Sequence, residues 1–227
     1  MTRSFLGQGR FITFEGGEGV GKSTQIKLLS AYLQSRGLEV VVTREPGGTL
    51  KAETLRRALL SGMFKSWGPL AETALFAAAR IDHIEKLILP ALHRGAWVLC
   101  DRFMDSTRAY QGANGGVSPE FMRWIEAASV GRAIPDLTLI LDLDPHEGLL
   151  RAHRRRQTNE APDRFEAEAL SFHLALRRAF HDIALEHPQR CLVIDAAASV
   201  AEVARIIQNY IDERFFSADI KIINREA

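Results

Sequence analysis

Short apolar runs alternate along this chain with longer stretches in which apolar side chains recur every three or four positions. The short runs predict strands at residues 11–14, 39–43, 97–100, 137–141 and 191–194. The longer stretches predict helices at residues 23–36, 52–60, 70–93, 119–130, 145–156, 165–186 and 200–214. Pro90 is expected to kink or break the third helix. Because strands and helices alternate, the pattern predicts an α/β fold with one doubly wound, five-stranded parallel sheet and helices on both faces.

The composition is that of a globular domain. With 227 residues, 46% of them hydrophobic and 25% charged, the chain is not a disordered protein, a collagen or a disulfide scaffold. We expect a single domain over residues 1–227, with a flexible tail over residues 216–227. The net charge of +1 favours neither a nucleic acid nor a membrane as a partner.

The two cysteines, Cys100 and Cys191, border apolar runs and are predicted to be buried in strands. They fit a reducing compartment and form no metal-binding pattern. Residues 1–10 contain no apolar signal segment, and no uncharged apolar run approaches the length of a membrane span. A cytoplasmic location is therefore expected.

The strongest motif lies between the first strand and the first helix. Residues 16–23 read Gly-Gly-Glu-Gly-Val-Gly-Lys-Ser and match G-x-x-x-x-G-K-[ST] in full. The glycines let backbone N–H groups turn around a phosphate, which the positive end of the helix dipole also favours. Lys22 suits the β- and γ-phosphates, and Ser23 suits Mg²⁺. The motif predicts a P-loop NTPase-type fold and an ATP site at Gly16, Gly17, Glu18, Gly19, Val20, Gly21, Lys22, Ser23 and Thr24.

Missing motifs narrow the class of nucleotide-binding protein. The chain lacks the Asn-Lys-x-Asp and Asp-x-x-Gly strings of a GTPase and the Leu-Ser-Gly-Gly signature of a transporter ATPase. Its third strand is followed by Asp-Arg rather than by the Asp-Glu of motor ATPases. A small kinase remains, in which a second substrate accepts the γ-phosphate.

Candidate acceptor-binding residues follow the second and third predicted strands. Asp101 could hold Mg²⁺ or orient the acceptor, and Arg102 could clamp its phosphate; a structural ion pair is the alternative. Residues 44–49 leave the second strand at the edge where open α/β sheets bind ligands, although Pro-Gly-Gly also suits a plain turn. Phe76 and Arg80 share a helix face and suit a base with its phosphate, unless Phe76 is a core residue.

Several motifs, in unbroken order, resemble those of bacterial thymidylate kinases. They are Phe14-Glu15-Gly16, Thr43-Arg44-Glu45-Pro46-Gly47-Gly48-Thr49, Leu75-Phe76-Ala77-Ala78-Ala79-Arg80, Asp101-Arg102-Phe103, Ala109-Tyr110-Gln111-Gly112, Pro135-Asp136-Leu137-Thr138 and Asp163-Arg164-Phe165-Glu166. The likeness spans roughly residues 10–215. The Arg-Glu-Pro-Gly-Gly-Thr and Ala-Tyr-Gln-Gly strings are specific to that family, whereas the phosphate loop alone is not.

The resemblance implies a dTMP site. Phe76 would stack on thymine, Arg80 would contact the base or the phosphate, and Arg102 would contact the phosphate. Glu18 would accept a hydrogen bond from the 3′-hydroxyl, and Tyr110 would crowd the 2′ position. The remaining implied contacts are Ser106 and Gln111 near the base, Arg44 and Glu45 placed by a cis peptide before Pro46, and Asp195 near adenine.

The resemblance also implies a mobile lid over residues 151–165. Some family members carry an arginine in the phosphate loop, where this chain has Gly19. In the other type the lid supplies the cation, and the lid here contains Arg151, Arg154, Arg155 and Arg156. A solvated helix face is the alternative for these arginines. The catalytic candidates are Lys22, Asp101, Arg102, Arg154, Arg155 and Arg156.

We therefore expect an ATP-dependent member of the thymidylate kinase family. It would convert dTMP to dTDP for dTTP supply in DNA synthesis, with Mg²⁺ held by Ser23 and Asp101. Family members are usually homodimers, and the helix at residues 70–93 is a plausible contact. The alternatives are another nucleoside monophosphate or deoxynucleoside kinase, and a P-loop protein that binds ATP without turnover.

Overall fold

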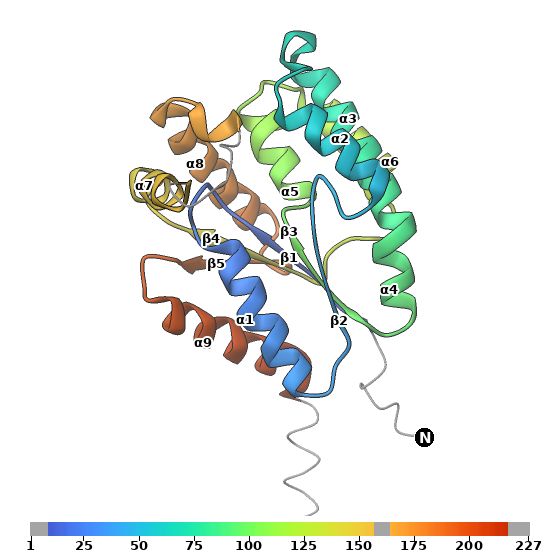
Figure 1. The fold of residues 1–227 in the computed structure, drawn as a ribbon, viewed down its shortest axis with the longest axis vertical. Helices are drawn as coiled ribbons and strands as arrows, with labels where there is room; N and C mark the ends of the chain where they lie inside the picture. The colour runs from blue at the N-terminus through green and yellow to red at the C-terminus, as the bar shows by residue number, and fades with distance from the viewer. Residues whose placement is uncertain (1–8, 157–163, 218–227) are drawn as a thin grey trace, which may run out of the picture.

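The computed structural model describes residues 9–156 and 164–217, and its centre is one parallel sheet (Figure 1). The strands are β1 (Phe11–Glu15), β2 (Val40–Arg44), β3 (Trp97–Asp101), β4 (Leu137–Asp142) and β5 (Cys191–Asp195). Their order is β2-β3-β1-β4-β5, so the central strand β1 is hydrogen-bonded to β3 and β4. All the pairs are parallel, which confirms the predicted sheet and brings the carboxyl ends of the strands to one edge.

Helices cover both faces of the sheet, as predicted. Those on one face are α1 (Lys22–Ser35) and α9 (Val200–Ile211). Those on the other are the π-helical turn η2 (Ile84–Ile88), α4 (Leu89–His93) and α8 (Leu170–Glu186). Ile12 and Phe14 pack with the first group, whereas Phe11 packs with η2 and α4. Because successive side chains of β1 point to opposite faces and helices cover both, every residue of this strand is buried.

The remaining helices lie beyond the carboxyl edge of the sheet or beside it. They are η1 (Lys65–Trp67), α2 (Leu50–Leu60), α3 (Gly68–His83), α5 (Met104–Thr107), η3 (Arg108–Ala113), α6 (Pro119–Val130), α7 (Pro145–Arg156) and η4 (Arg164–Ala167). Figure 1 shows α2, α3 and α6 grouped together, with α7 and α8 across the sheet edge from them. This edge carries the phosphate-loop motif.

Two predicted helices differ from the observed ones. The helix expected over residues 70–93 is three segments, because the π-helical turn η2 separates α3 from α4. Pro90 follows directly on η2, and Ile88 and Leu89 both have helical backbone angles, so its missing N–H removes one hydrogen bond from a continuous helical run. The helix expected from residue 165 begins only at Leu170, after a 3₁₀ turn.

The expected tail boundary is also wrong at Phe216. The last helix continues into a π-helical turn, η5 (Asp212–Phe216), and Phe216 is buried. The Phe216 ring stacks on Trp97, with the ring centroids 5.5 Å apart. The guanidinium carbon of Arg36 also lies 4.1 Å from the centroid of the Phe216 ring. The aromatic pair therefore anchors the chain to the core through this residue. Residues 218–227 lie outside the described part of the chain.

We expect Phe216→Ala to lower the free energy of unfolding by about 3 kcal/mol, the usual cost of truncating a buried phenylalanine. Leu185→Ala is the matched control because Leu185 is 79% exposed, and its cost should stay within about 0.5 kcal/mol. Urea unfolding of both variants measures the difference. Equal stability of the two variants would show that residue 216 belongs to a frayed tail.

Candidate functional site

The phosphate loop joins β1 to α1, where the motif predicted it. Gly16, Gly19 and Gly21 have φ angles of 126°, 69° and 97°, in the left-handed region that glycine enters without strain. These angles turn the chain around the start of α1, where free N–H groups and the helix dipole favour an anion. The predicted ATP-binding residues 16–24 therefore form one continuous turn and helix start.

Lys22 lies against the inner side of this loop. Its Nζ donates hydrogen bonds to the carbonyl oxygens of Gly16, over 3.0 Å, and Gly17, over 2.7 Å. Burial and the positive charge of Arg102 lower the pKa of the Lys22 ammonium to about 8, although the Glu18 carboxylate opposes this shift. The ammonium group is therefore held where phosphate oxygens can replace its carbonyl partners.

Ser23 and Asp101 meet beside the loop. Ser23 Oγ donates to Asp101 Oδ2 over 2.8 Å, because the end of β3 lies next to Phe14 of β1. Hydroxyl and carboxylate oxygens are the ligands that Mg²⁺ prefers. In the described ranges, no three His, Cys, Asp or Glu residues gather into a metal-binding cluster. A magnesium ion at this pair would take its other oxygens from water and from a phosphate ligand.

A second polar cluster joins the phosphate loop to the residues after β3. Arg102 Nη2 and the Tyr110 hydroxyl both donate to Glu18 Oε1, over 2.5 Å and 2.8 Å. Burial alone would raise the pKa of Glu18, but the charges of Arg102 and Lys22 outweigh burial and lower that pKa to about 2. Three residues predicted for the phosphate and sugar of the acceptor therefore lie in direct contact beside the donor loop.

Arg102 has an unusual backbone conformation. Its φ of 68° is the only positive value found at a non-glycine residue within residues 9–156 and 164–217. Such a conformation is strained and persists only where neighbouring contacts enforce it. Arg102 Nη1 donates to the Gly16 carbonyl over 3.2 Å and lies 3.4 Å from Ser106 Oγ. The turn thus directs the guanidinium toward the phosphate loop.

The turn after β2 contains a cis peptide bond between Glu45 and Pro46, as expected. Glu45 Oε2 accepts a hydrogen bond from Arg80 Nε over 2.8 Å, and Arg80 Nη2 donates to Thr107 Oγ1 over 2.8 Å. Phe76 lies one turn earlier on α3 and is half-buried. The structure therefore fixes Arg80 on the helix face that it shares with a partly accessible aromatic ring.

Other predicted acceptor residues are placed differently. Arg44 forms an ion pair with Glu53 of α2 over 3.1 Å and is exposed, so its side chain does not join the Arg80 cluster. Gln111 lies in the π-helical turn η3 and is buried. Ser106 Oγ is close to Arg102 and donates to the Glu15 carboxylate over 2.6 Å. The structure therefore gives Ser106 a partner that the sequence did not indicate.

The lid helix reaches the end of β5. Arg151 Nη1 donates to the carbonyl of Ala196 over 3.2 Å, and Arg151 also pairs with Glu147 one turn earlier. Asp195 is exposed at that strand end, which is the place expected for adenine. Arg154 is exposed on α7. The side chains of Arg155 and Arg156, and the lid residues 157–163, lie outside the described part.

Comparisons with known proteins agree on one family. The sequence profile described as thymidylate kinase matches residues 14–207. The chain belongs to the thymidylate kinase family. It is 56% identical over 212 residues to a thymidylate kinase of Bradyrhizobium sp. (strain ORS 278), covering 93% of each chain. It is 55% identical over 217 residues to that of Afipia carboxidovorans, covering 96% of this chain and 95% of the relative.

A solved structure supports the same assignment. The crystal structure of thymidylate kinase from Ehrlichia chaffeensis matches with a TM-score of 0.71 and 33% identity, covering 90% of this chain and 99% of that one. The predicted P-loop fold and the predicted family are therefore both confirmed. Neither alternative class of function gains support from these matches. No helix in the described ranges is long and apolar enough to cross a membrane.

A close contact with α7 explains why the loop of this thymidylate kinase family member has glycine at position 19. A Cβ atom on Gly19 would lie 1.9 Å from the carbonyl oxygen of Gly148, and a Cβ on Gly148 would lie 2.4 Å from that of Glu18. Two glycines thus let the phosphate loop and the lid helix touch through their backbones. An arginine at position 19 would require α7 to move.

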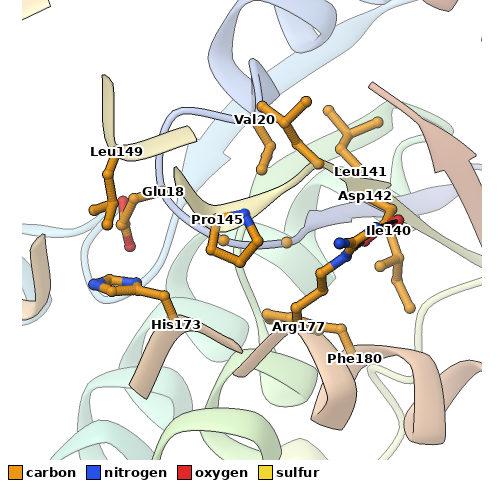
Figure 2. A pocket seen from close by; sticks show the side chains of 13 residues that line it. Glu18, Val20, Ile140, Leu141, Asp142, Pro145, Leu149, His173, Arg177 and Phe180 are labelled. Carbon is orange, nitrogen blue, oxygen red and sulfur yellow. Dashed lines mark hydrogen bonds and ion pairs between the residues drawn. The ribbon is translucent and has the colours of Figure 1, made fainter. Parts of the chain in front are cut away.

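Sequence reasoning missed several polar groups around this site. Figure 2 shows Glu18, His173 and Arg177 around a small pocket that borders the phosphate loop and α7. His173 is buried, and its Nε2 has no hydrogen-bond partner among the described residues. Only its place four residues before Arg177 on α8, a spacing that puts both on one helix face, was visible in the sequence. Glu15 was quoted only as part of a motif, yet it is a buried acidic side chain at the end of the central strand.

Proposed function

We propose that this protein transfers the γ-phosphoryl group of ATP to dTMP, giving ADP and dTDP. The observation that carries this proposal is the contact between Arg102, at the end of β3, and Glu18, inside the phosphate loop. It puts a cation suited to an acceptor phosphate within one hydrogen bond of the loop that would hold the donor. Phosphoryl transfer needs this alignment of two phosphates more than it needs covalent chemistry.

On the donor side, the N–H groups at the start of α1 and the Lys22 ammonium would bind the β- and γ-phosphates. Ser23 and Asp101 fit a magnesium ion, since they present a hydroxyl and a carboxylate oxygen 2.8 Å apart. When bound, Mg²⁺ would neutralise charge on the transferring group. Asp195 would lie beside adenine, at the strand end where Arg151 contacts Ala196.

On the acceptor side, Arg102 and Arg80 would contact the phosphate or the base, and Phe76 would stack on thymine. The Glu18 carboxylate, which is ionised at neutral pH because its pKa is about 2, would accept the 3′-hydroxyl hydrogen bond. Tyr110 donates to the same carboxylate, so its ring would lie close to the 2′ position and favour deoxyribose. Further contacts would come from Arg44, Pro46, Ser106 and Gln111.

The lid would supply a cation that the phosphate loop lacks. Gly19 leaves Lys22 as the only basic residue between positions 16 and 23, so Arg154, Arg155 or Arg156 would stabilise the transferring phosphate. Arg151 is a weaker candidate because it already pairs with Glu147 and the Ala196 carbonyl. A cation that arrives only on closure stabilises the transition state more than the ground state.

We also propose a single domain, a homodimer and a cytoplasmic location. Large apolar side chains are exposed on the grouped segments α2, η1, α3 and α6, which suits an interface between two copies of the chain. They are Leu50 (85% exposed), Trp67 (64%), Leu70 (54%) and Trp124 (65%). The predicted contact helix contributes only through its first part, since Ile84, Ile88 and Ala91 belong to the core.

An acceptor panel tests the proposed reaction. ADP release is measured with ATP and Mg²⁺ alone, then with dTMP, dUMP, the other nucleoside monophosphates and thymidine. We expect turnover with dTMP to exceed the rate without acceptor by several orders of magnitude, and thymidine to be inactive because it offers no phosphate to Arg102. Turnover of thymidine would indicate a deoxynucleoside kinase. ATP binding with no acceptor-dependent ADP release would indicate a non-catalytic protein.

Phe76→Ala should raise KM for dTMP by roughly tenfold or more, because stacking on an aromatic ring contributes about 1–3 kcal/mol per base. KM for ATP should change little. Steady-state kinetics with each substrate varied in turn measures the split. Leu185→Ala, at the exposed end of α8, is the control and should change neither constant. Equal losses for both substrates would assign Phe76 to the core instead.

A further inference from the structure

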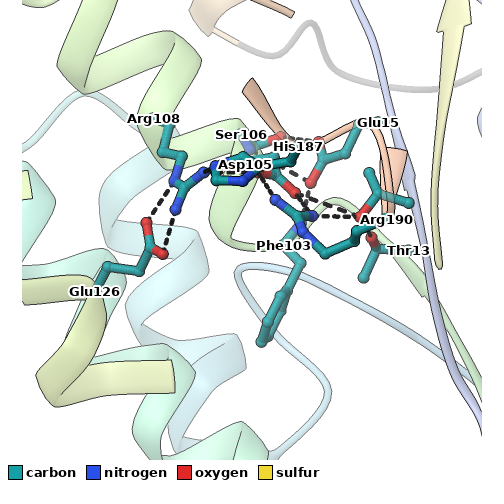
Figure 3. Close-up of polar contacts among 10 residues, drawn as sticks. Thr13, Glu15, Phe103, Asp105, Ser106, Arg108, Glu126, His187 and Arg190 are labelled. Carbon is teal, nitrogen blue, oxygen red and sulfur yellow. Dashed lines mark hydrogen bonds and ion pairs between the residues drawn. The ribbon is translucent and has the colours of Figure 1, made fainter. Parts of the chain in front are cut away.

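Glu15 is the last residue of β1, and its side chain is fully buried. Its Oε1 accepts hydrogen bonds from the backbone N–H of Phe103, over 2.7 Å, and of Ser106, over 3.3 Å. Its Oε2 accepts from Ser106 Oγ over 2.6 Å. One carboxyl group therefore binds the turn after β3 at three points and satisfies N–H groups at the start of the short helix α5 (Figure 3).

We propose that Glu15 is a positioning residue that holds Arg102 in register with the phosphate loop. The main chain of Glu15 leads directly into Gly16, and its side chain binds the residue that follows Arg102. A single residue thus connects the donor loop to the acceptor-binding turn. This inference rests on the proposed phosphoryl transfer to dTMP.

The backbone of Arg102 shows why this turn needs an anchor. A non-glycine residue at a φ of 68° carries strain on the order of 1–3 kcal/mol and relaxes unless its surroundings fix it. The Arg102 N–H donates to the Phe14 carbonyl over 2.9 Å, which fixes the turn on the side of β3, and the next fixed point after Arg102 is the Phe103 N–H, which Glu15 binds. Ser106 is bound by Glu15 and also lies 3.4 Å from Arg102 Nη1. Without the carboxyl group, the Phe103 N–H and the Ser106 side chain would both lose the hydrogen bonds that hold the turn beside Arg102.

The groups around Glu15 show that the anchor can act without a negative charge. Burial, together with the neighbouring Asp105 carboxylate, raises the pKa of Glu15 to about 8, although Ser106 and Arg102 oppose this shift. Asp105 is itself fully buried, and Arg190 binds both of its oxygens, over 2.6 Å and 2.9 Å. A neutral glutamic acid keeps Oε1 as an acceptor for the two N–H groups, while its O–H at Oε2 can donate to Ser106 Oγ, since a hydroxyl also accepts. An amide of the same shape should therefore serve in its place.

Three variants of Glu15 test the proposal. Glu15→Ala removes the anchor, Glu15→Asp retracts it by one methylene, and Glu15→Gln keeps its length and an acceptor oxygen. We expect kcat with dTMP to fall on the order of 10²-fold in Glu15→Ala, the typical cost of misplacing a reacting group. The kcat of Glu15→Asp should fall by a smaller factor, and the kcat of Glu15→Gln should stay within about tenfold of the wild-type value. The Kd for ATP, measured by titration without acceptor, should stay within about threefold in all three.

Thr13→Val is the matched control for loss of a buried hydrogen bond in the same strand. Thr13 Oγ1 bonds to Thr138 Oγ1 over 2.8 Å, and within the described residues it makes no hydrogen bond to Phe103 or Ser106. The midpoint of thermal unfolding of Thr13→Val should drop, while its kcat and both of its KM values stay near those of the wild type. If Glu15→Ala does not fold, the other two variants still test the proposal. It then requires a higher kcat in Glu15→Gln than in Glu15→Asp.

Wild-type kcat in folded Glu15→Ala or Glu15→Asp would overturn the proposal. A fall in ATP affinity as large as the fall in kcat would also overturn it, because that result would assign Glu15 to general stability. Loss of activity in Glu15→Gln equal to that in Glu15→Ala would show that charge, rather than position, is required. Wild-type protein assayed beside the variants separates these outcomes from a failure of the dTMP reaction itself.

Discussion

Lys22→Ala should lower kcat for phosphoryl transfer on the order of 10³-fold while leaving the fold intact. The Lys22 ammonium lies at the phosphate loop, 2.7 Å from the Gly17 carbonyl. It is suited to charge that builds on the β- and γ-phosphates, and removal of one such preorganised donor commonly costs 10²–10³-fold in rate. Folding should survive, since an alanine fits the helix start. Stopped-time ADP assays and circular dichroism measure the two properties.

The control for Lys22 is Lys27→Ala, an exposed lysine farther along α1, which should keep wild-type kinetics. Wild-type protein should also show a pH dependence from Lys22. Because its pKa is about 8 rather than 10.5, the ammonium form is lost as pH rises through 8, and kcat/KM for ATP should fall there. Near-normal kcat in Lys22→Ala would show that the loop does not act as a kinase phosphate loop.

The regular part of the fold could be predicted because it depends on local pattern. Each strand lies within one residue of its expected bounds, and the central strands do so because an apolar run buried on both faces has few alternative structures, whereas the edge strand β2 leaves Val42 52% exposed. The phosphate loop was also predictable, because its glycines and Lys22 must stand at fixed spacing for the loop to bind a phosphate. The cis peptide before Pro46 followed from the family likeness rather than from residue pattern.

What the sequence did not show depends on contacts between distant segments. Gly19 must be glycine because Gly148 of α7 lies against it, and nothing near either residue indicates that approach. Phe216 belongs to the core because it meets Trp97 at the start of β3. The segments α5 and η3 have no helical period of their own, and α5 begins where Glu15 accepts hydrogen bonds from the Phe103 and Ser106 N–H groups.

The sequence predicted which residues belong to the acceptor site, but it did not predict which of them hydrogen-bond to one another. The place of Arg102 after the third strand indicated a phosphate clamp, and likeness to a family supplied Glu18 and Tyr110. The structure joins all three through one carboxylate oxygen. Arg80 was expected to face the substrate, yet Glu45 and Thr107 bind it from the protein side. Such partners fix the orientation of a charged group, and they come from elements that no spacing rule connects.

The Arg102–Glu18 pair leads to the second large effect, a fall of roughly 10³-fold in kcat/KM for dTMP in Arg102→Ala. Truncating one member of a buried charge pair costs about 2–5 kcal/mol, partly because the remaining charge is left unpaired. Here the loss would remove the acceptor's phosphate clamp and release Glu18 from its 2.5 Å contact. Arg102→Lys should recover little, because an ammonium cannot reproduce the forked donor geometry of guanidinium.

The pH profile of Arg102→Ala should change in a defined direction. In the wild-type protein, Arg102 and Lys22 hold the pKa of Glu18 at about 2 against the effect of burial, so Glu18 stays ionised throughout the assay range. Without Arg102, burial meets less opposition and that pKa rises. Protonated Glu18 is a poorer acceptor for a 3′-hydroxyl, so kcat/KM for dTMP should gain a new decline on the acid side.

Arg94→Ala, which removes an exposed ion pair with Glu39, is the control and should leave both rate and profile unchanged. A variant at Arg102 that loses ATP and dTMP binding equally, with no new acid limb, would place Arg102 in the general structure of the loop and leave the acceptor phosphate to Arg80.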